Sequence, residues 1–243
     1  MGKSMDRRGY LLVGAAALCA GLTSGFKEFE PTGVVGGTRD AAGLLSLASL
    51  DDRERPYFDD DPTTVSGSGN QSVEFDSSGG FTIVLAEHDG EGLFSLTAAE
   101  SGGSPATILE WSGPETSVRG VPMAATEYTF DVAASGDWNL TVAQPRSPAG
   151  EVRSPPARAV GTGDAIVGPL DTTDGGLVSI DHEGDGSLTV TLFLEAGTGV
   201  FEPETLFEAT GPLEDEAPTS VAGVAWIAIH TDGSWTLEVD VPG

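Results

Sequence analysis

Apolar and polar residues alternate along most of the chain after about residue 65. The clearest examples are residues 129–132, 138–142 and 188–194, where every second residue is apolar. A period of two over several residues indicates a β-strand with one buried face, and Gly, Pro, Asp and Ser bound these runs as turn residues do. The pattern predicts an all-β protein.

Three pairs of segments recur in the same order, which indicates an internal repeat. EHDGEGLFSLT returns as DHEGDGSLTVT, EWSGP as EATGP, and SGDWNLTVAQP as DGSWTLEVDVP. His88 and Trp138 therefore correspond to His182 and Trp235. Copies of about 80 to 90 residues with closely spaced turns suggest two tandem small β-sandwich modules of about seven strands each. Trp138 and Trp235 share a strand face with Leu and Val, so we expect both rings between the sheets.

The N-terminal segment pairs positive charge with a short apolar run. Arg7 and Arg8 precede the apolar residues 11–22, which are too few for a membrane-spanning helix of about 20 residues. The sequence DRRGYLL resembles twin-arginine export signals, which implies secretion of a folded chain. Two alternatives stay open: an uncleaved anchor, and a lipid-modified Cys19, which is the only cysteine.

The remaining boundaries follow from composition. We predict a signal peptide over residues 1–25, a flexible acidic stalk over 26–64, and the first repeat over 65–145. A Pro- and Arg-containing linker over 146–159 leads to the second repeat over 160–243. Such a linker predicts modules that unfold independently.

The charge balance limits the class of partner. The chain has a formal net charge of −27 and only two lysines, Lys3 and Lys27. Nucleic acid and anionic membrane surfaces would repel it, and we expect no membrane insertion of the mature chain. Molar salt shortens the Debye length to about 3 Å, so crowded carboxylates stop repelling one another. The composition therefore suggests adaptation to brine.

Together these features resemble one group of proteins. The paired arginines, the acidic surface and the repeated Gly-x-Trp-x-Leu-x-Val-x-x-Pro pattern are similar to uncharacterised twin-arginine-exported surface proteins of halophilic archaea that carry tandem small β-sandwich repeats. The resemblance implies an extracellular or cell-surface location and says little about biochemical activity.

No catalytic motif stands out, and we assign no catalytic residue and no cofactor. His88 and His182 occupy equivalent turns, so we expect local packing or hydrogen bonding rather than chemistry. The acidic residues around these turns have the i, i+2, i+4 spacing of oxygen-ligand calcium loops, followed by Gly. Calcium is therefore an open alternative to a solvated acidic turn, with six candidate ligands: Glu87, Asp89, Glu91, Asp181, Glu183 and Asp185.

Two further features concern the surface. Asn70 and Asn139 each begin an Asn-x-Ser/Thr sequon, so both are candidate glycosylation sites. Trp111 and Trp226 are candidates for surface function. Trp226 is out of phase with Ile227 and Ile229, so its ring either stacks on a sugar or covers a contact between the modules.

Three functional hypotheses follow. The first is a non-catalytic secreted or cell-surface structural or interaction protein, whose partner is a cell-surface protein or glycan. The second is a module that binds envelope glycans or divalent cations. The third, ranked last, is a carboxylate-dependent hydrolase hidden in the acidic background.

Overall fold

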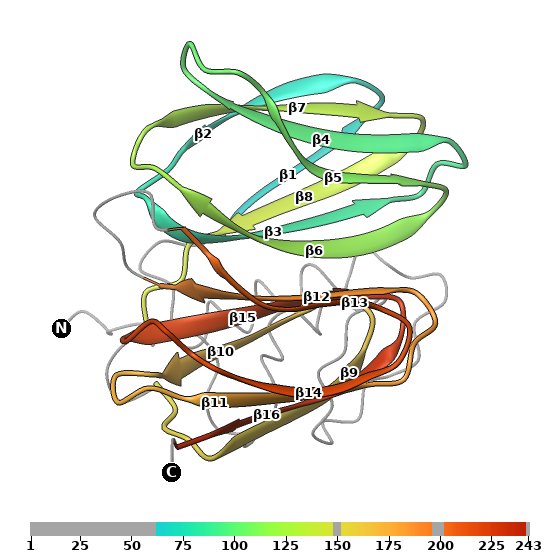
Figure 1. The fold of residues 1–243 in the computed structure, drawn as a ribbon. Helices are drawn as coiled ribbons and strands as arrows, with labels where there is room; N and C mark the ends of the chain where they lie inside the picture. The colour runs from blue at the N-terminus through green and yellow to red at the C-terminus, as the bar shows by residue number, and fades with distance from the viewer. Residues whose placement is uncertain (1–61, 148–151, 196–201, 242–243) are drawn as a thin grey trace, which may run out of the picture.

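The computed structural model describes residues 62–147, 152–195 and 202–241. The predicted signal peptide with Arg7, Arg8 and Cys19, and almost all of the predicted stalk, lie outside the described residues. Within the described residues the chain is all-β (Figure 1). No helix in this part of the chain is long and apolar enough to cross a membrane.

The first module contains eight strands, one more than the approximate count predicted from the sequence. They are β1 (Thr63–Ser68), β2 (Gln71–Asp76), β3 (Gly80–His88), β4 (Leu93–Glu100), β5 (Ala106–Ser112), β6 (Glu115–Met123), β7 (Glu127–Ala134) and β8 (Asp137–Ala143). Two four-stranded antiparallel sheets form a sandwich, with strand orders β1-β8-β3-β6 and β2-β7-β4-β5.

The second module repeats this topology strand for strand. Its strands are β9 (Ala157–Thr162), β10 (Ala165–Asp171), β11 (Leu177–His182), β12 (Ser187–Leu194), β13 (Glu204–Thr210), β14 (Leu213–Pro218), β15 (Val224–Thr231) and β16 (Ser234–Asp240). The sheets have the orders β14-β11-β16-β9 and β10-β15-β12-β13. Mostly exposed strands such as β14, LEDEAP, lack apolar alternation, so a count based on periodicity falls short.

Each module has its own apolar core between its two sheets. The inward residues of β3, Val84 and Ala86, lie in the first core, and Val178 and Ile180 of β11 occupy the same places in the second. The predicted position of the repeated Trp is confirmed. Trp138 and Trp235 are 2% and 3% exposed and belong to the two cores.

The same hydrogen bond anchors both Trp rings. Trp138 Nε1 donates to the Gly69 carbonyl at 3.0 Å, and Trp235 Nε1 donates to the Gly163 carbonyl at 2.9 Å. Each acceptor lies in the turn between the first two strands of its module. The buried indole N–H is therefore satisfied, as a buried donor must be.

Candidate functional site: the seam between the modules

The two modules share a third apolar cluster, which we call the seam. The outer face of the β1-β8-β3-β6 sheet packs on the outer face of the β10-β15-β12-β13 sheet (Figure 1). The buried members of the seam are Phe81, Ile83, Leu85, Val118 and Ala143 of the first module and Ile166, Phe193 and Trp226 of the second. Both faces contribute large apolar side chains, so the modules are stacked rather than merely tethered.

Aromatic packing forms the centre of the seam. The Phe81 ring lies 5.0 Å from the Phe193 ring and 5.7 Å from the Trp226 ring, centroid to centroid, and stacks on Trp226. Gly120 on β6 allows this approach, because a Cβ there would lie 2.7 Å from the Phe81 ring and 3.1 Å from the Phe193 ring. Trp226 is fully buried. Of the two alternatives for this residue, the contact between the modules is confirmed, and sugar stacking is excluded.

A polar cluster at the edge of the seam surrounds Asp164, and we call it the Asp164 cluster. From β6 of the first module, Ser117 Oγ donates to Asp164 Oδ2 at 2.6 Å, and Arg119 Nη1 lies 3.6 Å from the same oxygen. From β15 of the second module, His230 Nδ1 and the Thr231 backbone N–H both reach Asp164 Oδ1. A carboxylate that is 8% exposed thus joins the two modules.

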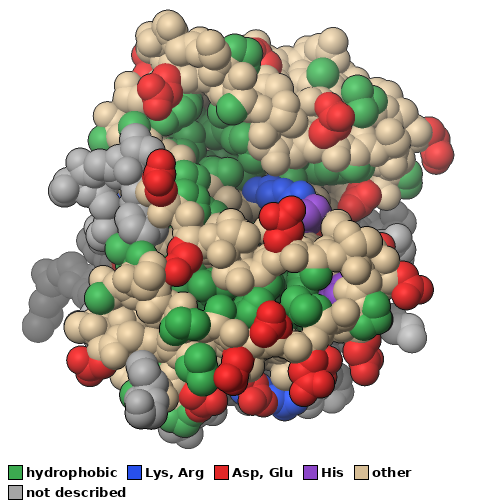
Figure 2. Space-filling view, viewed as in Figure 1, with side chains coloured by type: hydrophobic (Ala, Val, Ile, Leu, Met, Phe, Trp, Pro, Cys, Tyr) green, Lys and Arg blue, Asp and Glu red, His purple; other side chains and the backbone are tan. Residues whose placement is uncertain are grey.

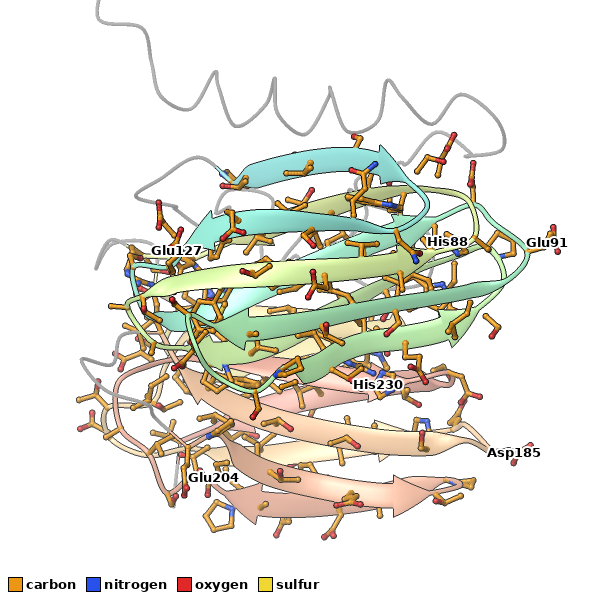
Figure 3. The ribbon with its side chains drawn as sticks, turned by 90° about the horizontal axis from the view of Figure 1, so that it is seen from above. His88, Glu91, Glu127, Asp185, Glu204 and His230 are labelled. Carbon is orange, nitrogen blue, oxygen red and sulfur yellow. The ribbon has the colours of Figure 1, made fainter. Side chains whose placement is uncertain are left out.

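Hydrogen-bond chemistry fixes the roles within the Asp164 cluster. Arg119 Nη2 lies 2.6 Å from His230 Nε2, and a guanidinium can only donate. His230 Nε2 is therefore the acceptor, so Nδ1 carries the hydrogen that faces Asp164. Burial lowers the pKa of Arg119, and the negative charges of Asp164 and Glu115 oppose that effect. Figure 3 labels His230 at the boundary between the modules.

The Asp164 cluster contains Ser, His and Asp side chains, but their hydrogen bonds do not have the arrangement that nucleophilic catalysis requires. A serine nucleophile needs its hydroxyl on the free nitrogen of the histidine. Here Ser117 donates to the carboxylate, and Arg119 occupies His230 Nε2. The arrangement serves to join charged groups across the seam. In the space-filling view, basic, histidine and acidic side chains meet at this boundary (Figure 2).

A second buried carboxylate lies elsewhere in the seam, and we call its surroundings the Glu195 cluster. Ser147, at the start of the linker, donates to Glu195 through its backbone N–H and its hydroxyl, both at 2.6 Å. Trp226 Nε1 donates to Glu195 Oε2 at 2.8 Å, and the Glu195 carbonyl accepts the Phe81 backbone N–H at 3.2 Å. The linker and both modules therefore converge on one residue that is 4% exposed.

The histidine turns behave as the sequence predicts. His88 Nδ1 lies 3.1 Å from the Gly113 carbonyl, and His182 Nδ1 lies 3.1 Å from the Gly211 carbonyl. Both rings are buried, and the His88 ring packs on Phe94 at 5.4 Å between centroids. The equivalent contacts indicate that each histidine ring connects the end of its strand, β3 or β11, to the β5–β6 or β13–β14 turn, respectively.

The six candidate calcium ligands are spread over strands and turns. Glu87 is buried on β3 and accepts a hydrogen bond from Asn139 Nδ2 at 3.4 Å, and burial raises the pKa of its carboxyl against the effect of that bond. Asp89 Oδ1 accepts the Asp137 backbone N–H at 2.8 Å. Glu91 and Asp185 point away from the molecule at separate turn tips (Figure 3).

The second module carries the remaining pair of these acids beside the turn. Asp181 lies on the outer face of β11, and Glu183 is exposed after the strand ends. Among the residues that the structure describes, no three His, Cys, Asp or Glu side chains are grouped so that they would hold a metal ion.

The outer face of the second module is hollowed and acidic. The hollow has a volume of about 540 Å³ and is lined by Arg158, Ser179, Ile180, Asp181, Glu214, Asp215, Glu216, Thr236 and Glu238. Arg158 Nε pairs with Glu238 at 2.8 Å, and both side chains are about half exposed. None of these described lining residues has an aromatic side chain that would stack on a sugar.

Trp111 is half-buried at the edge of the first module. Its ring stacks on Phe94 at 4.3 Å between centroids, so it extends the core. Its Nε1 atom is buried and has no hydrogen-bond partner among the described residues. The ring is thus mainly a packing element and only in part a surface group.

Sequence reasoning missed most of the seam, although one signal was present. The segments 83–86 and 225–229 are continuously apolar instead of alternating, which is typical of strands buried on both faces. Nothing comparable identifies the Asp164 and Glu195 clusters, because carboxylates are common throughout the chain. The chain matches no protein-family model and no curated protein sequence.

Proposed function

We propose that the protein is an exported, non-catalytic structural or interaction protein of the cell surface or the medium, in a salt-adapted cell. The observation that carries the proposal is the seam. Large apolar side chains and two buried carboxylates are used to stack one module on the other. A protein whose buried carboxylates and their hydrogen bonds join its own two modules is suited to holding the modules in a fixed arrangement.

The outer faces suit the proposed environment. The outer strand face of the second module carries Asp181, Glu214, Glu216 and Glu238 around one arginine. Repulsion among such carboxylates weakens in molar salt, because the Debye length falls to about 3 Å. The proposed partner is a cell-surface protein or a glycan that meets these polar faces.

Export is the first test of this proposal. Replacing Arg7 and Arg8 together by Lys keeps the charge but removes the guanidinium pair. We expect the double variant to accumulate inside the producing cell, whereas the wild type appears in the surface or medium fraction. Lys3→Arg is the matched control and should be exported normally. Normal export of the double variant would contradict the twin-arginine route.

The second test concerns the partner. Chemical cross-linking on intact cells in molar salt, followed by capture of the tagged full chain, should recover one partner in near-stoichiometric amount. Replacing Glu214 and Glu216 together by Gln should reduce recovery if the hollowed face is used. Turnover of glycan or peptide substrates by the purified chain, lost on replacing a carboxylate, would instead favour the hydrolase hypothesis.

A further inference from the structure

The two sequons of the chain lie in very different places. Asn70 and Asn139 are the only two asparagines, and each begins an Asn-x-Ser/Thr sequence. We infer that Asn70 is the residue modified by an N-linked glycan in the folded protein and that Asn139 is not. This inference rests on the proposed export, because the modification takes place outside the cytoplasm.

The amide of Asn70 is held with its nitrogen free. Asn70 is exposed in the turn between β1 and β2, directly after Gly69, whose φ is 66°. Its Oδ1 accepts the Ala134 backbone N–H at 3.2 Å. Among the described residues its Nδ2 donates no hydrogen bond, so the reacting nitrogen stays available to an enzyme.

The second module shows that this orientation is a property of the turn. Asp164 follows Gly163 as Asn70 follows Gly69, and its Oδ1 accepts the Thr231 backbone N–H at the same 3.2 Å. In the second module the seam covers the turn, and Asp164 is 8% exposed. In the first module the equivalent turn is exposed and carries Asn70, the residue that would accept the sugar.

The rest of this sequon is also accessible. Gln71 and Ser72 begin β2, which is an edge strand of its sheet and, among the described strands, pairs with β7 alone. Both side chains are exposed, and the Ser72 hydroxyl donates to Asp131. A strand end at a sheet edge opens at low cost in free energy, so an enzyme can draw the tripeptide into its site.

Asn139 is unavailable by comparison. It lies in β8, between β1 and β3, so its backbone pairs with strands on both sides. Its Oδ1 accepts from Ser66, and its Nδ2 donates to Glu87. Modification of this side chain would require the sheet to open and would break both hydrogen bonds.

The reaction is a glycosyl transfer from a lipid phosphate- or pyrophosphate-linked saccharide. A bond forms between Asn70 Nδ2 and the anomeric carbon of the sugar, and the bond from that carbon to the phosphate oxygen breaks. The lipid phosphate leaves with the electron pair, and the transferase takes the proton from Nδ2. The chain itself supplies only the acceptor.

The test uses folded full-length chain, incubated in molar salt with membranes of the producing cell that contain the transferase and its donor. Peptide mapping by mass spectrometry should find sugar on Asn70 alone. Asn70→Gln should abolish the added mass, and Asn139→Gln should leave it unchanged. After unfolding, the same chain should also accept sugar on Asn139, because the barrier is the fold.

Two outcomes would overturn the inference: sugar on Asn139 of the folded chain, or no sugar on Asn70 while a free peptide with the Asn70-Gln71-Ser72 sequence is modified in the same membranes. The peptide shows that the transferase is active. The location of the wild-type protein in the cell, measured separately, reports on the proposed export. The two failures are therefore distinguishable.

Discussion

Strands β3 and β11 hold the same place in the two modules but face different surroundings. Both direct apolar residues inward and end in a buried histidine. On the outer face, however, β3 places Ile83 and Leu85 in the seam, whereas β11 places Leu177 and Ser179 on an outer surface. One topology thus supports either a docking face or a solvated face, depending on alternate residues of a single strand.

Strands β15 and β7 show the converse difference. The outward residues of β15 include Trp226 and His230, which belong to the seam and to the Asp164 cluster. At the equivalent positions β7 carries Thr129 and an exposed Ala133. Each module therefore docks through a different sheet, and the two remaining outer faces are polar. Among the described residues, neither free face offers an apolar surface like that of the seam.

The largest effect should come from deleting the central ring of the seam. Trp226→Ala removes a fully buried Trp and one donor to Glu195, and such truncations cost about 3–5 kcal/mol of unfolding free energy. The shared seam also changes the expectation of independent unfolding: the wild type should melt in one transition and this variant in two. Calorimetry in molar salt measures both effects.

Thr129→Ala is the matched control for Trp226→Ala, because it changes the equivalent position on a free face. Surface changes of this kind stay within about 0.5 kcal/mol. Two separate transitions already present in the wild type would show that the seam does not couple the modules.

The next effect concerns the exchange of equivalent residues between β3 and β11. Leu85→Ser places in the seam the residue that β11 has at the equivalent position, Ser179. It should lower the free energy of unfolding by about 2–4 kcal/mol, in the range of buried Leu truncations. Ser179→Leu gives the free face the residue of the seam and should leave the melting temperature almost unchanged. Thermal melting of both variants checks the pair; equal losses would mean that the two faces do not differ.

A smaller effect is expected at the turns that carry Asp164 and Asn70. Asp164→Asn keeps an oxygen for the Thr231 N–H but removes the charge that Arg119 and His230 face, so we expect a loss of about 1–3 kcal/mol. Asn70→Asp makes the reverse change at an exposed turn and should be nearly neutral. Urea titration measures the free energy of unfolding of both variants. If Asp164→Asn leaves this free energy unchanged, the Asp164 cluster does not stabilise the seam.

The comparison also shows how far the sequence predicts this protein. Alternating residues and the repeated Trp suffice for two all-β sandwiches, because burial on one face of a strand leaves a period of two. To predict the seam, one would have to know that the continuous apolar run at residues 83–86 faces the other module, which carries a second such run at residues 225–229, and not solvent. The partners of Asp164 come from strands far apart in the chain, and no local pattern records their meeting.

A still smaller effect should appear at Glu87. Burial raises the pKa of this carboxyl, so the folded chain binds its proton more tightly than the unfolded chain does. The ionised form therefore weakens the fold above the folded pKa, and the penalty disappears as the pH falls below the ordinary value of 4.5. Glu87→Gln removes the charge and keeps an acceptor for Asn139. It should raise the melting temperature slightly at pH 7 and not at pH 4.

Asp181→Asn is the control for Glu87→Gln, because Asp181 is the exposed equivalent in the second module. Its melting temperature should not change at either pH. A gain for Glu87→Gln that persists undiminished at pH 4 would show that charge is not its cause.

The smallest expected effect is that of calcium, and it separates two explanations of the acidic turns. If the carboxylates form a solvated surface, stability should rise continuously with potassium chloride up to molar concentration, because screening weakens all repulsions together. Calcium or a chelator at constant ionic strength should then leave the melting temperature unchanged. A true site would instead stabilise the fold by about 2.7 kcal/mol at a hundredfold excess over its dissociation constant.

We favour the first explanation, because Asp89 Oδ1 already accepts the Asp137 backbone N–H, and because Glu91 and Asp185 each point away from the other acids of their own turn. Replacing Asp89 and Asp185 together by Asn provides the decisive variant. If calcium stabilises the wild type and this double variant abolishes the effect, the turns are metal sites and the surface explanation fails. If salt alone stabilises both proteins equally, the acids of the two modules serve hydration, and the seam remains the feature by which the modules differ.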